Sequence, residues 1–334
     1  MVFSKPKPTP RKKKPVYVDK PNQTIPDVFP EEIKKLKVDP SLPLSYLLQE
    51  DVELEPSICG KIQTGSMLKY HFQHFKEHPQ VDAGKCGETK FPKIVKNILV
   101  NEKYENIVKM FPTTMQDAEK IEKETVGQAN CETWFKERRE RLTASQFGKI
   151  CKRKKAVNDA FLKDIFPASN KNFSTSATRY GQGNENAAKK KYLESFQERH
   201  IHDCGLVINP DFPYLAASPD GKVCFKGETG VLEVKCPFTA RDMTISEAVQ
   251  QIPKFCLQEN DGKFELQKNH DYFFQIQGQM MVSGATFCEF IVFTRKDIFV
   301  QNVKEDLNFQ KDMFEMLSNF YLQHGAKYVK MPRI

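Results

Sequence analysis

The sequence has no long apolar run, and none of its hydrophobic stretches approaches the length of a membrane-spanning helix. The first residues, MVFSKPKPTPRKKKP, also lack the apolar segment of a secretory signal peptide. We therefore expect neither a membrane partner nor secretion for this chain of 334 residues.

Cysteine pairs are absent as well. The nine cysteines are an odd number, and no two of them form a Cys-x-x-Cys pair. This distribution argues against a disulfide scaffold and favours an intracellular, reducing compartment. His71, His74 and His78 fall between Cys59 and Cys86, but the spacing matches no zinc pattern. We expect these histidines to share one face of a helix instead.

Acidic residues are in the minority, with 43 Asp and Glu against 51 Lys and Arg, a formal net charge of +8. Residues 5–20 hold seven basic side chains and one Asp, with prolines between them. Such a segment cannot bury a core, so residues 1–24 are predicted to be a disordered basic tail. Its RKKKP stretch (residues 11–15) is typical of a nuclear-import signal or a DNA-touching arm, with a merely solvated tail as the alternative.

Two further regions follow the tail. Residues 25–125 mix proline-punctuated stretches with modest helical patterns, and we expect a mostly helical extension of unknown role. From residue 126 the patterns sharpen and predict an α/β domain over residues 126–334. The predicted elements are a helix over 129–150 interrupted at Thr143–Ser145, a helix over 180–199 after a glycine-rich turn, a β-meander over 206–238, a helix over 270–284, a hairpin over 287–303 and a helix over 305–325 that Gly325 ends.

One predicted strand, GVLEVKCPF (residues 230–238), carries charges that a buried strand should not have. Glu233 and Lys235 interrupt its apolar residues and face the same side of the strand. Burying them is costly unless they are paired or hold a metal ion. Upstream, Asp220 follows Pro219 at a turn, which completes the pattern Pro-Asp…Glu-x-Lys.

These residue types suit the hydrolysis of a phosphodiester. The carboxylates of Asp220 and Glu233, with a backbone carbonyl, are ligands for Mg²⁺, which keeps some of its waters and binds substrate phosphate. The ammonium of Lys235 can position the attacking water, help to deprotonate it, or offset developing negative charge. Taken alone the pattern is weak, and a surface turn beside an edge-strand salt bridge is the alternative interpretation.

The surrounding residues point to one family. Five segments, in the same order along the chain, resemble the phage lambda exonuclease and YqaJ family of viral recombination nucleases within the PD-(D/E)xK superfamily. These segments are WFKERRERLTAS (134–145), GNENAA (183–188), AASPDG (216–221), LEVKCPFTARD (232–242) and YFFQIQ (272–277). The resemblance implies a PD-(D/E)xK restriction-endonuclease-like core, which is a mixed central sheet flanked by helices. Residues 1–125 have no counterpart in it.

The resemblance also assigns roles to individual residues. Arg138 and Ser145, with Trp134, match the family's phosphate-binding residues. Glu185 matches the family's helix glutamate near the metals, and Gln275 matches its active-site glutamine. Each of these five residues also has an interpretation that involves no catalytic or binding role. Arg138 and Glu185 could be solvated helix charges, Ser145 a helix N-cap, Gln275 a polar residue of a half-buried helix, and Trp134 part of the core.

The implied metal site consists of Asp220, Glu233 and the carbonyl of Val234, with a contribution from Glu185, and holds Mg²⁺ or Mn²⁺. The implied activity removes one strand of duplex DNA from a 5′ end, in recombination or DNA processing. A homo-oligomer (a trimer) and a single-strand annealing partner follow from the resemblance alone. Two other hypotheses stay open: a DNA-end-binding or adaptor module without turnover, and an endonuclease.

Overall fold

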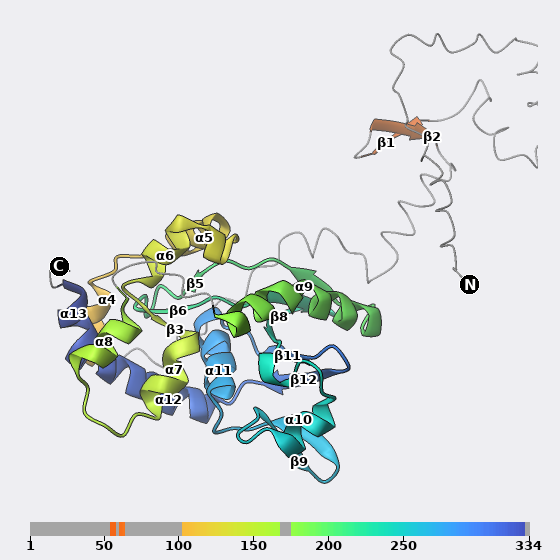
Figure 1. Cartoon of the computed structure of the whole chain (residues 1–334). Helices are drawn as coiled ribbons and strands as arrows, with labels where there is room; N and C mark the ends of the chain where they lie inside the picture. The colour runs from red at the N-terminus through yellow and green to blue at the C-terminus, as the bar shows by residue number, and fades with distance from the viewer. Residues whose placement is uncertain (1–53, 58–59, 64–101, 168–174, 331–334) are drawn as a thin grey trace, which may run out of the picture. The chain divides into compact units, whose positions relative to one another are not determined.

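The computed structural model describes residues 54–57, 60–63, 102–167 and 175–330 (Figure 1). The chain divides into two units, residues 1–77 and 78–334. In the first unit, β1 (Leu54–Ser57) and β2 (Gly60–Gln63) pair antiparallel. The predicted basic tail, the three histidines and their two neighbouring cysteines lie outside the described residues.

A five-stranded sheet forms the centre of the second unit, with the order β12-β11-β8-β7-β4. The pair β8–β11 is parallel and the other pairs are antiparallel, so the sheet is mixed, as predicted. Lys226 and Gly227 turn the chain between β7 and β8, and both have positive φ, as tight hairpins require. The strands are β4 (His200–His202), β7 (Gly221–Phe225), β8 (Glu228–Lys235), β11 (Phe287–Phe293) and β12 (Ile298–Lys304).

The predicted meander over residues 206–238 is wrong in one respect, because its strands belong to two sheets. β5 (Val207–Ile208) and β6 (Leu215–Ala217) join β3 (Leu142–Thr143) in a three-stranded sheet with the order β3-β6-β5. The chain changes sheet at residues 218–220. Pro219 lies at this point and has no N–H to donate to a strand ladder.

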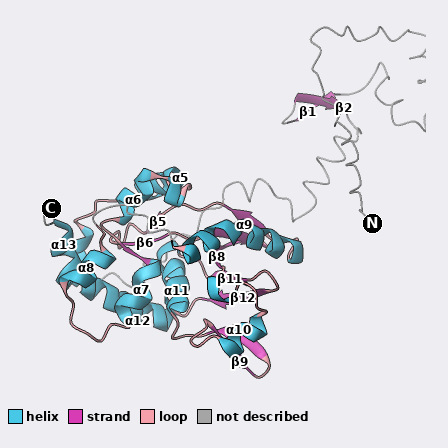
Figure 2. Ribbon diagram, viewed as in Figure 1, coloured by secondary structure: helices cyan, strands magenta, loops and turns pink. Residues whose placement is uncertain are grey.

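Helices cover both faces of the central sheet (Figure 2). On one face, α9 (Ser176–Ser195) packs Ala188 and Tyr192 against alternate residues of β7, β8 and β11. On the other face, α11 (Asp271–Ser283) packs Ile276 and Met280 against the intervening residues of β8 and β11. This arrangement confirms the expected mixed sheet flanked by helices.

The remaining helical elements surround this core. They are η2 (Glu102–Tyr104), α4 (Glu105–Val108), α5 (Met115–Glu124), η3 (Gln128–Asn130), α6 (Glu132–Arg138), α7 (Ala144–Cys151), α8 (Asp159–Ile165), η4 (Phe238–Ala240), α10 (Ile245–Gln251), α12 (Leu307–Phe320), the π-helical η5 (Tyr321–Gly325) and α13 (Ala326–Lys330). After α10, β9 (Leu257–Asn260) and β10 (Lys263–Leu266) form a hairpin.

Residues 102–125, which precede the predicted domain, pack against it. Ile107 lies in the same core as the buried residues of α7 and α12, and Ala118 of α5 packs on Leu206 and Ile208. The described residues before 126 therefore combine one strand pair with a helical segment. The helical segment covers the small sheet.

Three boundary predictions had different outcomes. The predicted interruption is confirmed, but it lies earlier than Thr143–Ser145, because α6 ends at Arg138 and α7 already begins at Ala144. Thr143 is the N-cap of α7, and its N–H and hydroxyl donate to Oε1 of Gln146. The glycine-rich turn before α9 is wrong, since Thr175 caps that helix and the glycines lie inside it. Gly325 does not end the last helix. It allows close packing on Tyr321 and Phe166, and α13 follows it.

We expect Gly205→Ala to destabilise the domain, because a Cβ at this position would lie 1.9 Å from the carbonyl oxygen of Glu122 in α5. The backbone would have to shift, at a cost of about 1–3 kcal/mol in the free energy of unfolding. Gly183→Ala is the matched control. A Cβ at Gly183 would have no atom within 4 Å, and alanine favours the helix by about 0.5–1 kcal/mol. Urea denaturation of both variants measures the difference, and equal stability would contradict the tight contact.

Candidate active site

Asp220 lies at the point where the chain leaves the small sheet and enters β7. The backbone N–H of Val234, on the neighbouring strand β8, donates a hydrogen bond of 2.8 Å to Oδ2 of Asp220. Pairing of Gly221 with Leu232 fixes this register. Burial raises the pKa of Asp220 well above its ordinary value, and the charge of Glu233 adds to the effect. The carboxyl therefore occupies a place where negative charge is already in excess.

Glu233 is the acidic residue that interrupts the apolar strand, and both oxygens of its side chain are hydrogen-bonded. Its Oε1 accepts hydrogen bonds from Nζ of Lys235 (2.5 Å) and Nε2 of Gln275 (2.6 Å). Its Oε2 accepts one from Nε2 of Gln279, also at 2.6 Å. Both glutamines project from α11, the helix that covers this face of β8. The charge is thus buried because an ammonium and two amides surround it.

Gln279 is a site residue that the sequence analysis missed. It stands four residues after Gln275, so the two amides share one face of α11 and grip the two oxygens of one carboxylate. The spacing in the stretch QIQGQ (residues 275–279) was the available signal, because glutamines at positions i and i+4 share one face of a helix and each needs a hydrogen-bond partner once that face is buried.

Lys235 lies beside Glu233 and 4.7 Å from the centre of the Tyr272 ring. Burial alone would lower the pKa of Lys235, but the carboxylates of Glu233 and Asp220 raise it above its ordinary value. The side chain is therefore an ammonium at neutral pH, and its remaining protons can be donated to a phosphate oxygen or a water molecule.

A cavity of about 590 Å³ opens at these residues. Asp220, Val234 and Lys235 line its sheet side, and Glu185 lines it from α9. The other lining residues are Ala177, Thr178, Gly181, Gln182, Cys236, Pro237, Phe238, Thr239 and Tyr272. The structure thus brings four of the predicted catalytic and metal residues to one cavity, while Gln275 lies behind it as a partner of Glu233.

Glu185 forms an ion pair with Lys189, a residue that the sequence did not predict to be part of the site. Nζ of Lys189, one turn later on α9, donates to Oε1 of Glu185 (2.6 Å). The same ammonium donates to the backbone carbonyl of Asp220 at 2.5 Å. Glu185 is therefore an acid held beside the Asp220 turn, rather than a freely solvated surface charge.

Two of the three predicted phosphate-binding residues, Trp134 and Arg138, contact Ser218, two residues before Asp220. Nε1 of Trp134 and a guanidinium nitrogen of Arg138 donate to Oγ of Ser218, at 2.9 and 3.0 Å. The guanidinium also stacks 4.0 Å from the centre of the Trp134 ring. Burial lowers the pKa of Arg138 to about 10, so it remains a cation at neutral pH.

Ser145 is exposed in the first turn of α7, with its hydroxyl 3.3 Å from that of Thr143. Thr143, rather than Ser145, is the N-cap. Among the contacts of the described residues, none joins Ser145 to Arg138, so the structure places these two predicted partners on separate elements.

The donors around the cavity fit a hard divalent cation. Among the described residues, no three His, Cys, Asp or Glu side chains form a ready metal cluster. The predicted set contains only oxygen donors: Asp220, Glu233, Glu185 and the Val234 carbonyl. Burial and the charge of Glu233 raise the pKa of Asp220, and a bound cation would offset both effects. Burial raises the pKa of the nearby Cys236 thiol to about 12, which disfavours a thiolate ligand.

An Asp at the start of one strand and a Glu-x-Lys on its neighbour, in a mixed sheet between helices, match the PD-(D/E)xK pattern that the sequence resembles. Comparison with known families agrees. Residues 133–286, slightly less than half of the chain, match the YqaJ-like viral recombinase domain. This match confirms the family resemblance of the five sequence segments.

Two curated relatives are viral. The alkaline nuclease of Orgyia pseudotsugata multicapsid polyhedrosis virus is 26% identical over 163 residues, which cover 40% of this chain and 38% of that protein. The alkaline nuclease of Autographa californica nuclear polyhedrosis virus is 24% identical over 140 residues, 38% of this chain and 33% of that protein. The chain therefore spans well under half the length of these relatives.

Among solved structures, an alkaline exonuclease (LHK-Exo) from Laribacter hongkongensis is similar, with 22% identity and a TM-score of 0.46. The similarity covers 59% of this chain and 94% of that one.

We expect Asp220→Ala to weaken binding of Mn²⁺ by at least about 100-fold, since partners that only support a metal ligand already account for losses of that size. Isothermal titration calorimetry with Mn²⁺ measures the affinity directly. Asp312→Ala, an exposed carboxylate on α12, is the control and should bind Mn²⁺ as the unchanged protein does. Equal affinities for the two variants would remove Asp220 from the metal site.

Proposed function

We propose that the protein is a metal-dependent nuclease that hydrolyses one strand of duplex DNA from a 5′ end. The observation that supports this most is the arrangement of Asp220 and Lys235 at one cavity, with Glu233 buried behind them and hydrogen-bonded to Lys235, Gln275 and Gln279. A binding module has no need of both a buried metal-binding carboxylate and an adjacent ammonium. The two viral relatives, both alkaline nucleases, agree with a nuclease.

In this proposal, Asp220, Glu233 and the carbonyl of Val234 hold Mg²⁺ or Mn²⁺, with Glu185 at the edge of the site. The ion would supply Lewis acidity and a more acidic water. Lys235 donates hydrogen bonds to the attacking water or to a phosphate oxygen and so offsets negative charge that develops during hydrolysis. Gln275 and Gln279 keep Glu233 in one orientation. A cavity of about 590 Å³ has room for a nucleotide.

Arg138 supports a preference for DNA ends. Its guanidinium is held by Trp134 and Ser218, close to the Asp220 turn but on a separate element. A phosphate bound there would lie one step away from the bond that is cut, with Ser145 and the start of α7 as further donors. A terminal phosphate carries almost one more negative charge than an internal diester, so it gains more from this guanidinium.

The biological setting belongs to the same proposal. Double-stranded DNA ends are the proposed partner, and a trimer and a single-strand annealing protein are carried by the family resemblance alone. The basic tail is proposed as a nuclear-import signal or DNA-contacting arm. In the described part of the chain, no helix combines the length and the hydropathy that crossing a membrane requires.

We expect Asp220→Ala and Glu233→Gln to abolish DNA cleavage while DNA binding in the presence of a chelator survives. Each variant removes a charge from the metal site and leaves the basic surface unchanged. The assay follows end-labelled linear duplex with Mg²⁺ and with chelator, and a closed circular duplex distinguishes an endonuclease. Near wild-type cleavage by either variant would show that the assignment is wrong. Binding without any cleavage by the unchanged protein would favour the end-binding module.

We also expect 5′-phosphorylated duplex to be degraded faster than 5′-hydroxyl duplex, by about 10- to 100-fold, the range of one hydrogen bond to a charged group. Arg138→Ala should remove most of this preference. Lys136→Ala, which deletes an exposed charge from the same helix, should retain it. Initial rates of the three proteins on both substrates decide the matter. Equal wild-type rates on the two ends would eliminate the terminal-phosphate pocket and favour an endonuclease.

A further inference from the structure

The peptide groups on both sides of Asp220 are held by side chains from elsewhere in the chain. The carbonyl of Pro219, in the preceding peptide group, accepts a hydrogen bond of 2.8 Å from Nε2 of Gln128. The carbonyl of Asp220 itself accepts one of 2.5 Å from Nζ of Lys189. The two donors come from η3 and α9, which lie 91 and 31 residues from their acceptors along the chain.

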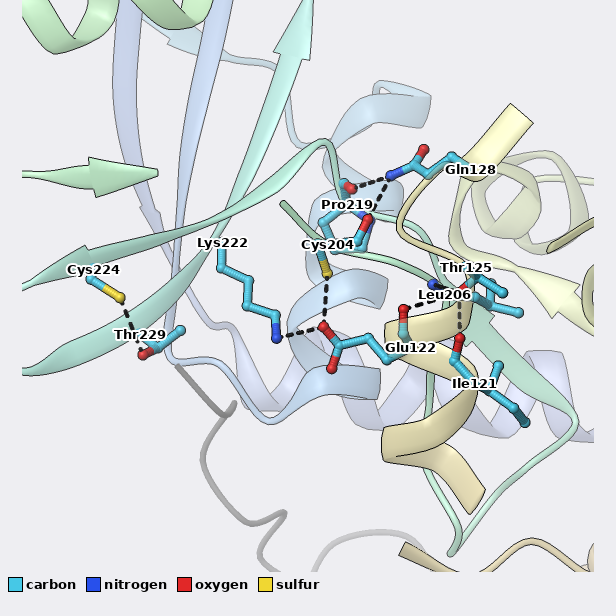
Figure 3. Close-up of polar contacts among 10 residues, drawn as sticks. All are labelled: Ile121, Glu122, Thr125, Gln128, Cys204, Leu206, Pro219, Lys222, Cys224 and Thr229. Atoms are coloured by element: carbon cyan, nitrogen blue, oxygen red, sulfur yellow. Dashed lines mark hydrogen bonds and ion pairs between the residues drawn. The ribbon is translucent and has the colours of Figure 1, made fainter. Parts of the chain in front are cut away.

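Gln128 binds a second carbonyl at the same time, as Figure 3 shows. Its Nε2 also donates to the carbonyl of Cys204, at 3.0 Å. One amide group therefore joins the two ends of the segment 204–219, which contains β5 and β6 and leads into Asp220. The backbone of Gln128 adopts a φ of +43°, in the left-handed region that residues other than glycine enter at a cost. Such a conformation persists where its surroundings fix it.

The helix before Gln128 is docked onto the same segment. Oγ1 of Thr125 accepts a hydrogen bond of 2.7 Å from the backbone N–H of Leu206 and donates one to the carbonyl of Ile121 (Figure 3). Glu122 forms an ion pair of 2.5 Å with Lys222, two residues after Asp220 on β7. Contacts from α5 and η3 thus reach the chain both before and after Asp220.

Asp220 needs this support for two reasons. Among the contacts of the described residues, its carboxyl accepts a hydrogen bond only at Oδ2, from the backbone N–H of Val234, so the direction of the side chain depends on where its backbone is held. The turn also lies where the chain passes between two sheets, so no strand ladder holds the Pro219 and Asp220 peptide groups. Side-chain donors to the two flanking carbonyls supply the missing restraint.

We propose that Gln128 and Lys189 are positioning residues that fix the Asp220 carboxyl for metal binding. This inference rests on the proposed nuclease function. Gln128 lies outside residues 133–286, the part that matches the family domain, so the segment before that part contributes to the site. Lys189 adds a positive charge next to Glu185, which keeps that acid at the rim of the cavity.

The test for Gln128 is Gln128→Met, which keeps the length of the side chain and removes its donors. We expect Mn²⁺ affinity by calorimetry to fall about 10- to 100-fold, as for other residues that orient metal ligands. The kcat for cleavage should fall by a similar factor while the KM for duplex DNA is unchanged. Gln116→Met, at an exposed glutamine of α5, is the matched control and should change neither value.

Lys189→Met tests the second peptide group independently, with the exposed Lys190→Met as its control. We expect the same combined loss of Mn²⁺ affinity and kcat, and this variant decides the question if Gln128→Met does not fold. Folded variants with wild-type Mn²⁺ affinity and kcat would overturn the inference while the nuclease function stands. Loss of DNA binding with Mn²⁺ affinity intact would also overturn it. An unchanged protein that neither binds Mn²⁺ nor cuts DNA would overturn the proposed function, and this inference with it.

Discussion

The rest of the site depends on one buried carboxylate. Glu233 lies 1% exposed in the middle of the central sheet, where a lone charge would be strongly destabilising. It is tolerated because Lys235, Gln275 and Gln279 together supply donors to both of its oxygens. This requirement ties β8 to α11 and fixes which face of the sheet is polar. The Lys235 ammonium pairs with this carboxylate, and Lys235 and Asp220 line the cavity.

Much of the fold was readable from the sequence because it depends on local patterns. The alternation in residues 287–303 predicted the β11–β12 hairpin, and the apolar helix before Gly284 predicted α11. Glu233 and Lys235 were singled out because charges in an apolar strand require an explanation, and Asp220 because it follows Pro219 at a turn upstream and completes the pattern. The division of the predicted meander between two sheets was not readable, since which strand β5, β6, β7 and β8 each pair with depends on distant parts of the chain rather than on local pattern.

The missed residues share one property, which is that their role depends on contacts with distant backbone or buried acids. Lys189 belongs to the run Lys189–Lys191, and nothing in that run distinguishes the lysine that reaches the carbonyl of Asp220. Gln128 lies 91 residues before its acceptor Pro219, in a segment without a family counterpart. The predicted roles of Arg138 and Ser145 came from the resemblance, and the structure places only Arg138 against the Asp220 turn.

The amides on α11 have a consequence for the range of solution conditions that the site tolerates. Gln275 and Gln279 carry no ionisable proton, so the donors that they offer to Glu233 are the same in mildly acidic and in alkaline solution. Two histidines in their place would release or gain protons in the middle of that range and would alter the charge beside the carboxylate. The choice of glutamine therefore separates the geometry of the site from its acid–base chemistry, and leaves proton exchange to the groups that face the cavity.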